Sequence, residues 1–377
     1  MATLILKPTE ACNAACTYCE VDRKGWRTTK IMPHDILERL FMRVNEFLEA
    51  RPRERLEIVW HGGEPLLLGP EYFDKARAFQ DKHCASTCGR IRHTIQTNLT
   101  LLTPAHVAAL RKLGMSSVGT SYDPVAGVRL LKKGDDGSAY NRAFLKAVAL
   151  LEREGFRWGV ICVVTKLSLA CPLDIFRFLT NLVPDGGVMF NPVNLEKPEH
   201  ERLKISAVEF ADFLGAIFPA WWENRKRYSR VEPFRSLCGD LLSEKKQNYF
   251  CADGGRCADT HFNLGPEGRW SHCGRSADWG LLDYGMIFDR SIAQVFSDAT
   301  RENLRQRNEV LSSGECRGCL WWSVCHGGCP LDGYMASGTL MGKTMWCRAK
   351  RDFIERYFIP VTGITPKTER VAEVECS

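Results

Sequence analysis

Three cysteines stand close together near the start of the chain, in ACNAACTYCE (11–20). Cys12, Cys16 and Cys19 follow C-x3-C-x2-C spacing, and thiolates this close can hold a metal centre. A closed zinc site needs a fourth ligand nearby, and none follows in the adjacent sequence. An iron–sulfur cubane that leaves one iron open to a substrate or cofactor needs only three thiolates. The spacing therefore favours an open cluster over zinc.

A second set of cysteines lies near the other end of the chain. It follows C-x5-C-x15-C and then C-x2-C-x5-C-x3-C spacing, with one more cysteine in TMWC. Eight thiolates suit two four-thiolate [4Fe–4S] clusters. Two zinc ribbons are the alternative, but they leave the first three cysteines unexplained. The members of this set are Cys251, Cys257, Cys273, Cys316, Cys319, Cys325, Cys329 and Cys347.

The elements that must position the first three cysteines alternate between strand and helix patterns. Apolar alternation and helical spacing predict six β-then-α units, which imply a parallel sheet with right-handed crossovers. Six units are fewer than the eight of a closed barrel, so we expect a partial barrel with its chemistry at the C-terminal strand ends. The predicted strands are 3–9, 56–65, 91–98, 116–123, 157–165 and 187–194, and the predicted helices are 33–50, 71–83, 104–114, 138–155, 172–183 and 206–227.

Composition excludes several classes of protein. The 377 residues are 45% apolar and 25% charged, with a net charge of +6. We find no signal peptide, no membrane-spanning stretch and no nucleic-acid module, and we expect a cytoplasmic protein with reduced thiols. The basic run 221–230 is read as a solvated helix face, or else as a dock for an acidic redox protein or peptide. The predicted domains are a barrel over 1–228, a cysteine-rich domain over 229–350, and a C-terminal helix and tail over 351–377, loose from 364.

The motifs resemble the radical S-adenosylmethionine (SAM) superfamily: C-x3-C-x-Tyr-C follows the first strand and GGEP the second. The resemblance implies that Cys12, Cys16 and Cys19 hold a [4Fe–4S] cluster whose open iron binds SAM. Electron transfer then releases a 5′-deoxyadenosyl radical. The residues that the resemblance assigns to SAM are Tyr18 beside the adenine, Gly62, Gly63 and Glu64 along the methionyl part, Ser121 near the ribose, and Thr97 and Asn98 in the same pocket. For Thr97, Asn98 and Ser121, the alternative is that they simply cap the ends of their strands.

The later cysteines resemble the SPASM extension of radical SAM enzymes. The resemblance implies two auxiliary [4Fe–4S] clusters, and so three clusters in total. Their ligands alternate along the sequence, so that each cluster does not simply take four consecutive cysteines. Auxiliary cluster I would use Cys251, Cys257, Cys273 and Cys329, and auxiliary cluster II would use Cys316, Cys319, Cys325 and Cys347. Of the remaining thiols, Cys162 is read as core, Cys84 and Cys88 as loop thiols, and Cys238 as a competing ligand of auxiliary cluster I or an ordinary buried thiol.

The resemblance implies a radical SAM oxidoreductase. SPASM enzymes mostly act on peptides or proteins, so we expect oxidative modification of a ribosomally made precursor peptide, with a cyclophane-type or other crosslink. Expected partners are this peptide, an electron donor such as flavodoxin or ferredoxin, and a separate leader-recognition protein, since the sequence starts directly on the first strand. The alternatives are anaerobic sulfatase maturation, which makes formylglycine, oxidation of a small molecule, and a non-enzymatic iron–sulfur scaffold.

One departure weighs against sulfatase maturation. Sulfatase-maturing relatives carry an aspartate directly after the third ligand of auxiliary cluster I, where it takes a proton from the substrate. This sequence has Gly274 at that position, in SHCGRSADW. Asp278 is the candidate to replace this carboxylate in the catalytic site, and a surface or cap residue is the alternative.

Overall fold

The structure is a computed structural model, and it describes residues 1–19, 30–183, 187–194, 198–246, 248, 251 and 253–366. Cys376 and the greater part of the predicted tail lie outside these residues. The chain divides into two compact units. The first unit comprises 1–161, 194–200 and 259–301, and the second comprises 162–193, 201–258 and 302–377.

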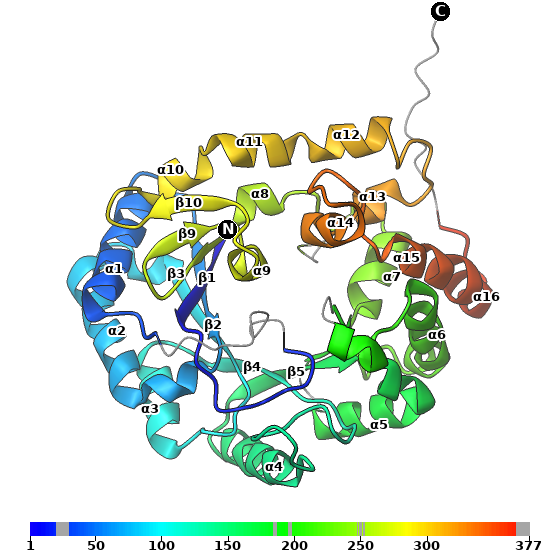
Figure 1. Ribbon diagram of the computed structural model, residues 1–377, viewed down its shortest axis with the longest axis horizontal. Helices are drawn as coiled ribbons and strands as arrows, with labels where there is room; N and C mark the ends of the chain where they lie inside the picture. Colours follow the sequence, from blue (N-terminus) through cyan, green and yellow to red (C-terminus); the bar gives the residue numbers. More distant parts are fainter. Residues whose placement is uncertain are drawn as a thin grey trace, which may run out of the picture. The chain divides into compact units, whose positions relative to one another are not determined.

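The first unit is built on a mainly parallel sheet. Its strands lie in the order β10-β9-β8-β1-β2-β3-β4-β5. The helices that follow β1, β2, β3 and β4 along the chain lie on the outer side of these strands (Figure 1). The predicted βα units are confirmed here to within a few residues. They are β1 (Ala2–Thr9), α1 (His34–Glu49), β2 (Leu56–Gly62), α2 (Pro70–His83), β3 (Ile91–Thr97), α3 (Pro104–Lys112), β4 (Ser117–Ser121), α4 (Ser138–Arg153) and β5 (Arg157–Val164), whose last three residues belong to the second unit.

Alternation along β1 explains how the sequence positions its polar residues. Leu4 and Leu6 are fully buried on the face toward the helices, whereas Ile5 and Lys7 point to the opposite face. The buried side chains of α1, such as Leu37, recur at helical spacing and close the same core. The opposite face, together with the C-terminal strand ends, is where side chains are available for chemistry.

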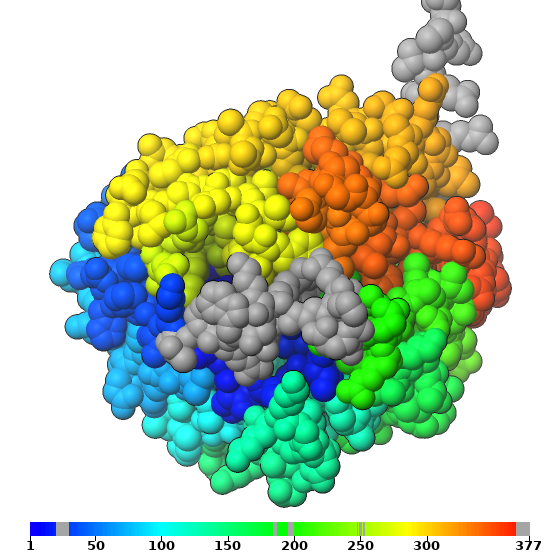
Figure 2. All heavy atoms as spheres, in the orientation of Figure 1, coloured from blue at the N-terminus to red at the C-terminus, as the bar shows by residue number. Residues whose placement is uncertain are grey.

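The sequence did not predict that residues after 228 extend this sheet. β8 (His261–Leu264) pairs in parallel with β1, and β9 (Arg269–Ser271) and β10 (Asp283–Met286) continue antiparallel. The yellow segment of these strands packs against the blue N-terminal elements in the space-filling view (Figure 2). A third of the predicted cysteine-rich domain thus contributes to the first unit, while the boundaries at 228 and 350 remain predictions.

The second unit contains the last βα units and most of the later cysteines. β6 (Gly187–Pro192) pairs in parallel with β7 (Val231–Glu232). The predicted helices appear as α5 (Pro172–Leu182) and α6 (Ala207–Glu223). In the described part of the chain, no helix is long and apolar enough to cross a membrane. The other helices around the cysteines are α7 (Phe234–Leu242), α12 (Arg307–Ser313), α13 (Trp322–Cys325), α14 (Pro330–Ser337) and α15 (Cys347–Phe353).

Candidate functional site

The N-terminal cysteine loop follows β1 and is held by backbone hydrogen bonds. Ala15 N–H donates to the carbonyl of Leu130 at 2.7 Å, and Thr17 N–H donates to that of Val128 at 3.0 Å. Both acceptors belong to the loop between β4 and α4. The loop that carries the three cysteines is therefore anchored to a segment more than a hundred residues later in the chain.

Hydrogen-bond donors point at two of these sulfurs. Two donors lie near Cys12 Sγ: the backbone nitrogen of Ala14 at 3.4 Å and the amide Nδ2 of Asn98 at 3.7 Å. Near Cys16 Sγ, Nη1 of Arg129 lies at 4.0 Å. Such donors stabilise anionic thiolates, so the donor set fits a metal-bound cysteine loop. Asn98 thus contacts a predicted cluster ligand.

A mononuclear metal site is not formed. Among the described residues, no three histidine, cysteine, aspartate or glutamate side chains gather closely enough to hold one metal ion. Thiolates bound to different irons of a cubane lie farther apart than ligands of one ion. The assignment of the three cysteines to a cluster continues to rest on their spacing in the sequence and on the donors at their sulfurs.

The fold requires glycine at positions 62 and 63, whether or not a ligand approaches the backbone there. A Cβ at Gly62 would lie 2.1 Å from the carbonyl oxygen of Thr9, and one at Gly63 would lie 2.1 Å from that of Ala11. Gly62 also has a φ of +116°. The glycine pair lets the end of β2 touch the backbone that leads into the cysteine loop, and a role along SAM remains a prediction for both residues.

Glu64, which the resemblance places along the methionyl part of SAM, is enclosed by its neighbours. Its side chain is fully buried, and its carboxylate accepts hydrogen bonds from Leu66 N–H, from the Thr97 hydroxyl at 2.6 Å and from Asn98 N–H at 2.7 Å. Burial raises its pKa to about 7. Two of these donors, Thr97 and Asn98, are 33 and 34 residues away in the sequence, so no local pattern reveals them. Thr97 is buried as well and acts here as a donor to Glu64.

Ser121 lies at the end of β4, with its hydroxyl accepting a hydrogen bond from Gln96 Nε2 at 3.1 Å. The Gln96 side chain occupies the space above Gly119, where a Cβ would lie 2.2 Å from the amide oxygen. Gln96 and Ser121 are both partly exposed on the face opposite the helices. Gln96 is thus a polar neighbour of the predicted SAM residue that the sequence did not single out.

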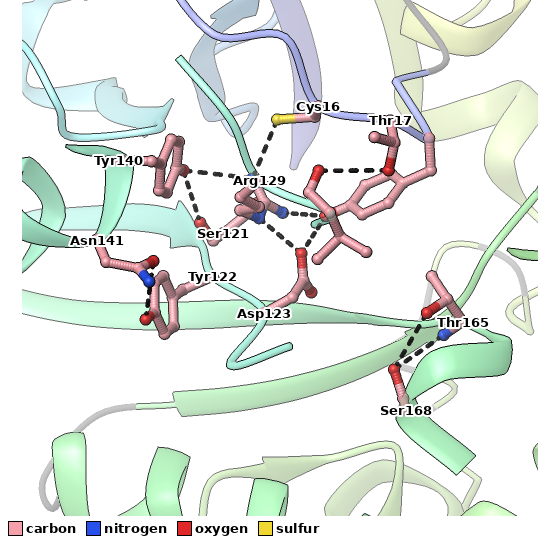
Figure 3. A network of polar contacts seen from close by, with 12 residues as sticks. Cys16, Thr17, Ser121, Tyr122, Asp123, Arg129, Tyr140, Asn141, Thr165 and Ser168 are labelled. Atoms are coloured by element: carbon pink, nitrogen blue, oxygen red, sulfur yellow. Dashed lines mark hydrogen bonds and ion pairs between the residues drawn. The ribbon is translucent and has the colours of Figure 1, made fainter. Parts of the chain in front are cut away.

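Arg129 is the centre of a buried polar network that includes Asp123 and Tyr140 (Figure 3), and Tyr18 contacts the same guanidinium. The Arg129 guanidinium donates to Asp123 Oδ2 at 2.6 Å and to the Tyr18 hydroxyl, and it reaches toward Tyr140 and Cys16. Arg129 is 8% exposed, and the pKa of Tyr18 is raised well above its usual value, chiefly by burial. The network ties the predicted adenine-side residue to a predicted cluster ligand.

Sequence reasoning missed Arg129 and Asp123. The available signal was an arginine set among apolar residues in GVRLL, in a segment with no helix or strand pattern. A buried guanidinium requires partners, and these lie several residues or more than a hundred residues away. Only the folded chain brings them together.

Asp278 is not a surface residue. Its carboxylate lies 2.6 Å from Lys7 Nζ, and the two side chains are 8% and 2% exposed. Lys7 also donates to the carbonyl of Gly274 at 2.9 Å. A Cβ on Gly274 would stand 3.1 Å from Lys7 Cε. The surface alternative for Asp278 was therefore wrong, because β1 supplies a buried cation that the sequence does not associate with this helix, α9 (Gly274–Asp278).

His61, at the end of β2, is also influenced by this lysine. Burial lowers its pKa to about 4, and the charge of Lys7 adds to that shift. Its Nδ1 accepts from Gly62 N–H at 2.7 Å, so its proton is on Nε2 and the ring is neutral near pH 7. His61 is a second residue of the strand ends that the motif reading left without a role.

The four cysteines predicted for auxiliary cluster II are brought together in the second unit. Cys319 N–H donates to the carbonyl of Cys316 at 3.0 Å. Burial raises the pKa of Cys316 to about 11 and that of Cys325 to about 12, and the neighbouring thiols of the set, Cys347 included, add to both shifts. Clustered thiols with raised pKa values need a metal centre to hold them as thiolates. The donor set therefore fits the predicted cluster.

The cysteines predicted for auxiliary cluster I divide between the units. Cys251, Cys257 and Cys329 belong to the second unit and Cys273 to the first. Their joint ligation remains a prediction.

The remaining described cysteines carry no ligand pattern. Cys162 is fully buried, as expected for core, whereas Cys84 is also fully buried and donates to the carbonyl of Phe41, so only Cys88 is an exposed loop thiol. Cys238 is buried in α7, and burial raises its thiol pKa. No disulfide joins the described cysteines.

Comparison with known proteins agrees with this geometry. A model of the Radical SAM superfamily matches residues 6–179. The cysteine-type anaerobic sulfatase-maturating enzyme of Clostridium perfringens (strain 13 / Type A) is 24% identical over 371 residues, covering 94% of this chain and 96% of the relative. The serine-type anaerobic sulfatase-maturating enzyme of Bacteroides thetaiotaomicron is 22% identical over 87% of this chain and 82% of its own length.

Solved structures share the fold. Native anSMEcpe with bound AdoMet and Cp18Cys peptide superposes with a TM-score of 0.81 at 22% identity, over 96% of this chain and 98% of that one. Streptococcus suis SuiB bound to precursor peptide SuiA gives a TM-score of 0.62 at 15% identity, over 92% and 75%.

Residues 6–179 thus form a radical SAM domain. The recognition from the cysteine and GGEP motifs is confirmed, and so is the α/β partial-barrel fold with a SPASM-type cysteine-rich region. The superfamily implies one [4Fe–4S] cluster and bound SAM.

Proposed function

We propose that the protein is a radical SAM/SPASM maturase that oxidatively crosslinks a ribosomally made peptide, using three [4Fe–4S] clusters. When bound, the N-terminal cluster with SAM supplies a 5′-deoxyadenosyl radical that removes a hydrogen atom from a C–H bond, and the auxiliary clusters supply electron-transfer sites. Structural neighbours that bind peptides, anSMEcpe with Cp18Cys and SuiB with SuiA, support a peptide substrate.

The observation that carries the choice of reaction is the position of the carboxylate beside Lys7. Sulfatase-maturing relatives are expected to carry it on the residue after the third cluster ligand, but that residue is Gly274. Here the carboxylate belongs to Asp278, four residues later on α9 and ion-paired with Lys7 at 2.6 Å. Since one helical turn advances about 5.4 Å, a proton acceptor at Asp278 stands away from the sulfatase-type position.

In this proposal the residues of the first unit divide the work. Lys7 orients the Asp278 carboxylate, which accepts the proton that the substrate loses. The neutral His61 offers its Nε2–H as a hydrogen-bond donor on the same strand ends. Ser121, Asn98 and Tyr18 hold SAM, while Glu64 and Thr97 fix the strand ends around it. A precursor peptide, an external flavodoxin or ferredoxin, and a separate leader-recognition protein complete the proposed partners.

Anaerobic sulfatase maturation is the second candidate, favoured by relatives that match nearly the whole chain. Mass spectrometry separates the two. The enzyme would be expressed with a short peptide encoded beside its gene, and separately incubated with SAM, dithionite and a sulfatase-type peptide that contains one cysteine. We expect the first peptide to lose the mass of two hydrogen atoms with every residue retained, and the second to stay unchanged.

Loss of sulfur from the cysteine peptide would instead establish formylglycine formation and overturn the crosslinking proposal. Asp278→Asn tests the proton acceptor: peptide product should fall by about 10²-fold, as for loss of a positioned base, while SAM cleavage without peptide continues. Glu267→Gln, a change at an exposed carboxylate of the same unit, is the matched control and should leave both rates unchanged.

A further inference from the structure

Arg307, the first residue of α12, is a buried guanidinium that clamps backbone carbonyls. It is 4% exposed, and its Nη1 and Nη2 donate to Gly328 at 2.8 Å, to Gly327 at 3.0 Å and to Gly342 at 2.7 Å. A longer contact of 3.5 Å reaches the carbonyl of His326. All these residues belong to the second unit, so the clamp is internal to it.

The clamped turn joins ligands of the two predicted auxiliary clusters. Gly327 and Gly328 lie between Cys325, assigned to cluster II, and Cys329, assigned to cluster I. Both glycines have positive φ, at +74° and +70°. A Cβ on Gly328 would lie 2.4 Å from Thr344 Cγ2. The turn therefore requires glycine, and Arg307 fixes the spacing of the two ligands.

The charge of Arg307 is not matched by a carboxylate. Among the described residues its hydrogen-bond partners are carbonyls alone, and its buried Nε–H has no partner. Burial lowers the pKa of Arg307, and the thiols of the two clusters oppose that shift. These thiols are Cys257, Cys329, Cys316 and Cys325. A buried cation with an unused donor, close enough to thiols of both sets for their charge to affect it, fits an anionic cluster.

We infer that Arg307 is a positioning residue shared by the two auxiliary clusters, holding one ligand of each at a fixed separation and donating its Nε–H to a cluster sulfur. Its positive charge favours the reduced form of the neighbouring clusters and so raises their potentials. This inference rests on the assignment of two auxiliary clusters under the proposed function.

Potentiometric EPR on the anaerobically reconstituted full chain tests the electrostatic role. In a background with Cys12, Cys16 and Cys19 replaced by alanine, only auxiliary clusters should contribute. We expect Arg307→Met to lower the ratio of reduced to oxidised cluster about tenfold at a fixed potential, a shift of about 59 mV for one electron. Arg307→Lys retains the positive charge and should therefore change the reduction potential less than Arg307→Met.

Arg90→Met is the matched control. Nη1 of Arg90 also donates to three carbonyls, those of Leu48, Arg51 and Glu54, but in the first unit. Its loss should lower the melting temperature without moving the potentials. If Arg307→Met kept its full iron content and the reduction potentials of the auxiliary clusters did not change, Arg307 would serve only to hold the backbone, and the inference would be overturned.

A measurement on unmutated Arg307 covers the case in which Arg307→Met loses its iron. With ¹⁵N-labelled arginine in the same background, in which only Cys12, Cys16 and Cys19 are replaced, pulsed EPR should detect ¹⁵N coupled to a reduced auxiliary cluster. About eight irons per chain without such coupling would overturn the role of Arg307 alone. Absence of iron from this background would instead overturn the two-cluster assignment and with it the proposed function.

Discussion

The N-terminal cysteine loop and the C-terminal cysteine segment are held in different ways. The first depends on distant partners: Ala15 is bound to Leu130, and Glu64 N–H donates to the carbonyl of Ala11 at 2.8 Å. The second depends on local turns. Gly328 N–H donates to Cys325 at 2.8 Å, and Cys347 N–H donates to Thr344 at 3.1 Å. The open-cluster loop is thus held by segments distant in sequence, while local turns together with the Arg307 clamp hold the later ligands of the second unit.

The two regions also differ in how they balance a buried arginine. Arg129 beside the N-terminal loop is paired with the Asp123 carboxylate, whereas among the described residues Arg307 donates its hydrogen bonds to backbone carbonyls. The first site is electrically complete before any cofactor binds. The second leaves a positive charge for an anionic group to offset. This difference suits the proposed division between a reactive cluster that admits SAM and auxiliary clusters that exchange electrons.

The largest expected effect separates the two regions by their metal content. The chain should bind about twelve irons after anaerobic reconstitution, and replacing Cys12, Cys16 and Cys19 with alanine should leave about eight and abolish SAM cleavage. The matched change of Cys316, Cys319 and Cys325 to alanine should also remove about four irons but leave dithionite-driven SAM cleavage measurable. Iron analysis and chromatography of 5′-deoxyadenosine check both. Continued formation of 5′-deoxyadenosine by the first variant would contradict the assignment of the reactive cluster.

The arginine comparison predicts unequal stability losses. Arg129→Met leaves the buried Asp123 carboxylate unpaired, so the free energy of unfolding should fall by about 3–5 kcal/mol. Adding Asp123→Asn should recover part of this loss, because the stranded charge is then gone. Arg307→Met strands no carboxylate and should cost less. Anaerobic urea denaturation of the unmodified chain and the three variants measures the order of these stability losses. Equal losses for Arg129→Met and Arg307→Met would contradict the difference in charge pairing between the two arginines.

Glu64, which joins β2 to β3 near the N-terminal loop, should make stability depend on pH. Its pKa rises from 4.5 to about 7 on burial, so between these values the folded chain holds a proton that the unfolded chain releases. Stability from the protonated form is therefore complete below about pH 4.5 and is lost as pH rises through about 7. The free energy of unfolding should fall by up to about 3 kcal/mol over this range.

Glu64→Gln should flatten this dependence, because the amide does not titrate. Urea denaturation at several pH values across the same window gives both slopes. Parallel slopes for the two proteins would show that Glu64 is already ionised in the folded chain, with its three donors outweighing burial.

The smallest effect is expected at a thiol that serves neither region. Cys88 is exposed at the end of the turn after α2, so Cys88→Ser should change the free energy of unfolding by no more than about 0.5 kcal/mol. Iron content should stay at about twelve per chain. A loss of iron from this variant would mean that the C-x3-C pair takes part in cluster binding.

Much of the fold was readable from local pattern. Alternation of apolar residues and helical spacing located the strands and helices of the βα units within a few residues, because both depend on neighbours close in sequence. Cysteine spacing likewise predicts the ligand groups, and that assignment stays a prediction. No local pattern predicted that residues 261–286 pair with the sheet beside β1. Strand pairing depends on an exposed sheet edge that is formed by residues far away in the sequence.

The sequence by itself determined the radical SAM class, the cysteine sets and the glycine at position 274. The tertiary structure alone decided the surroundings of these residues. It buried Glu64, paired Asp278 with Lys7 across 271 positions of sequence, and enclosed Arg129 and Arg307 near thiols. The physical reason is that a charged side chain in a sequence is by default solvated. Its burial depends on partners that only folding brings within hydrogen-bond distance.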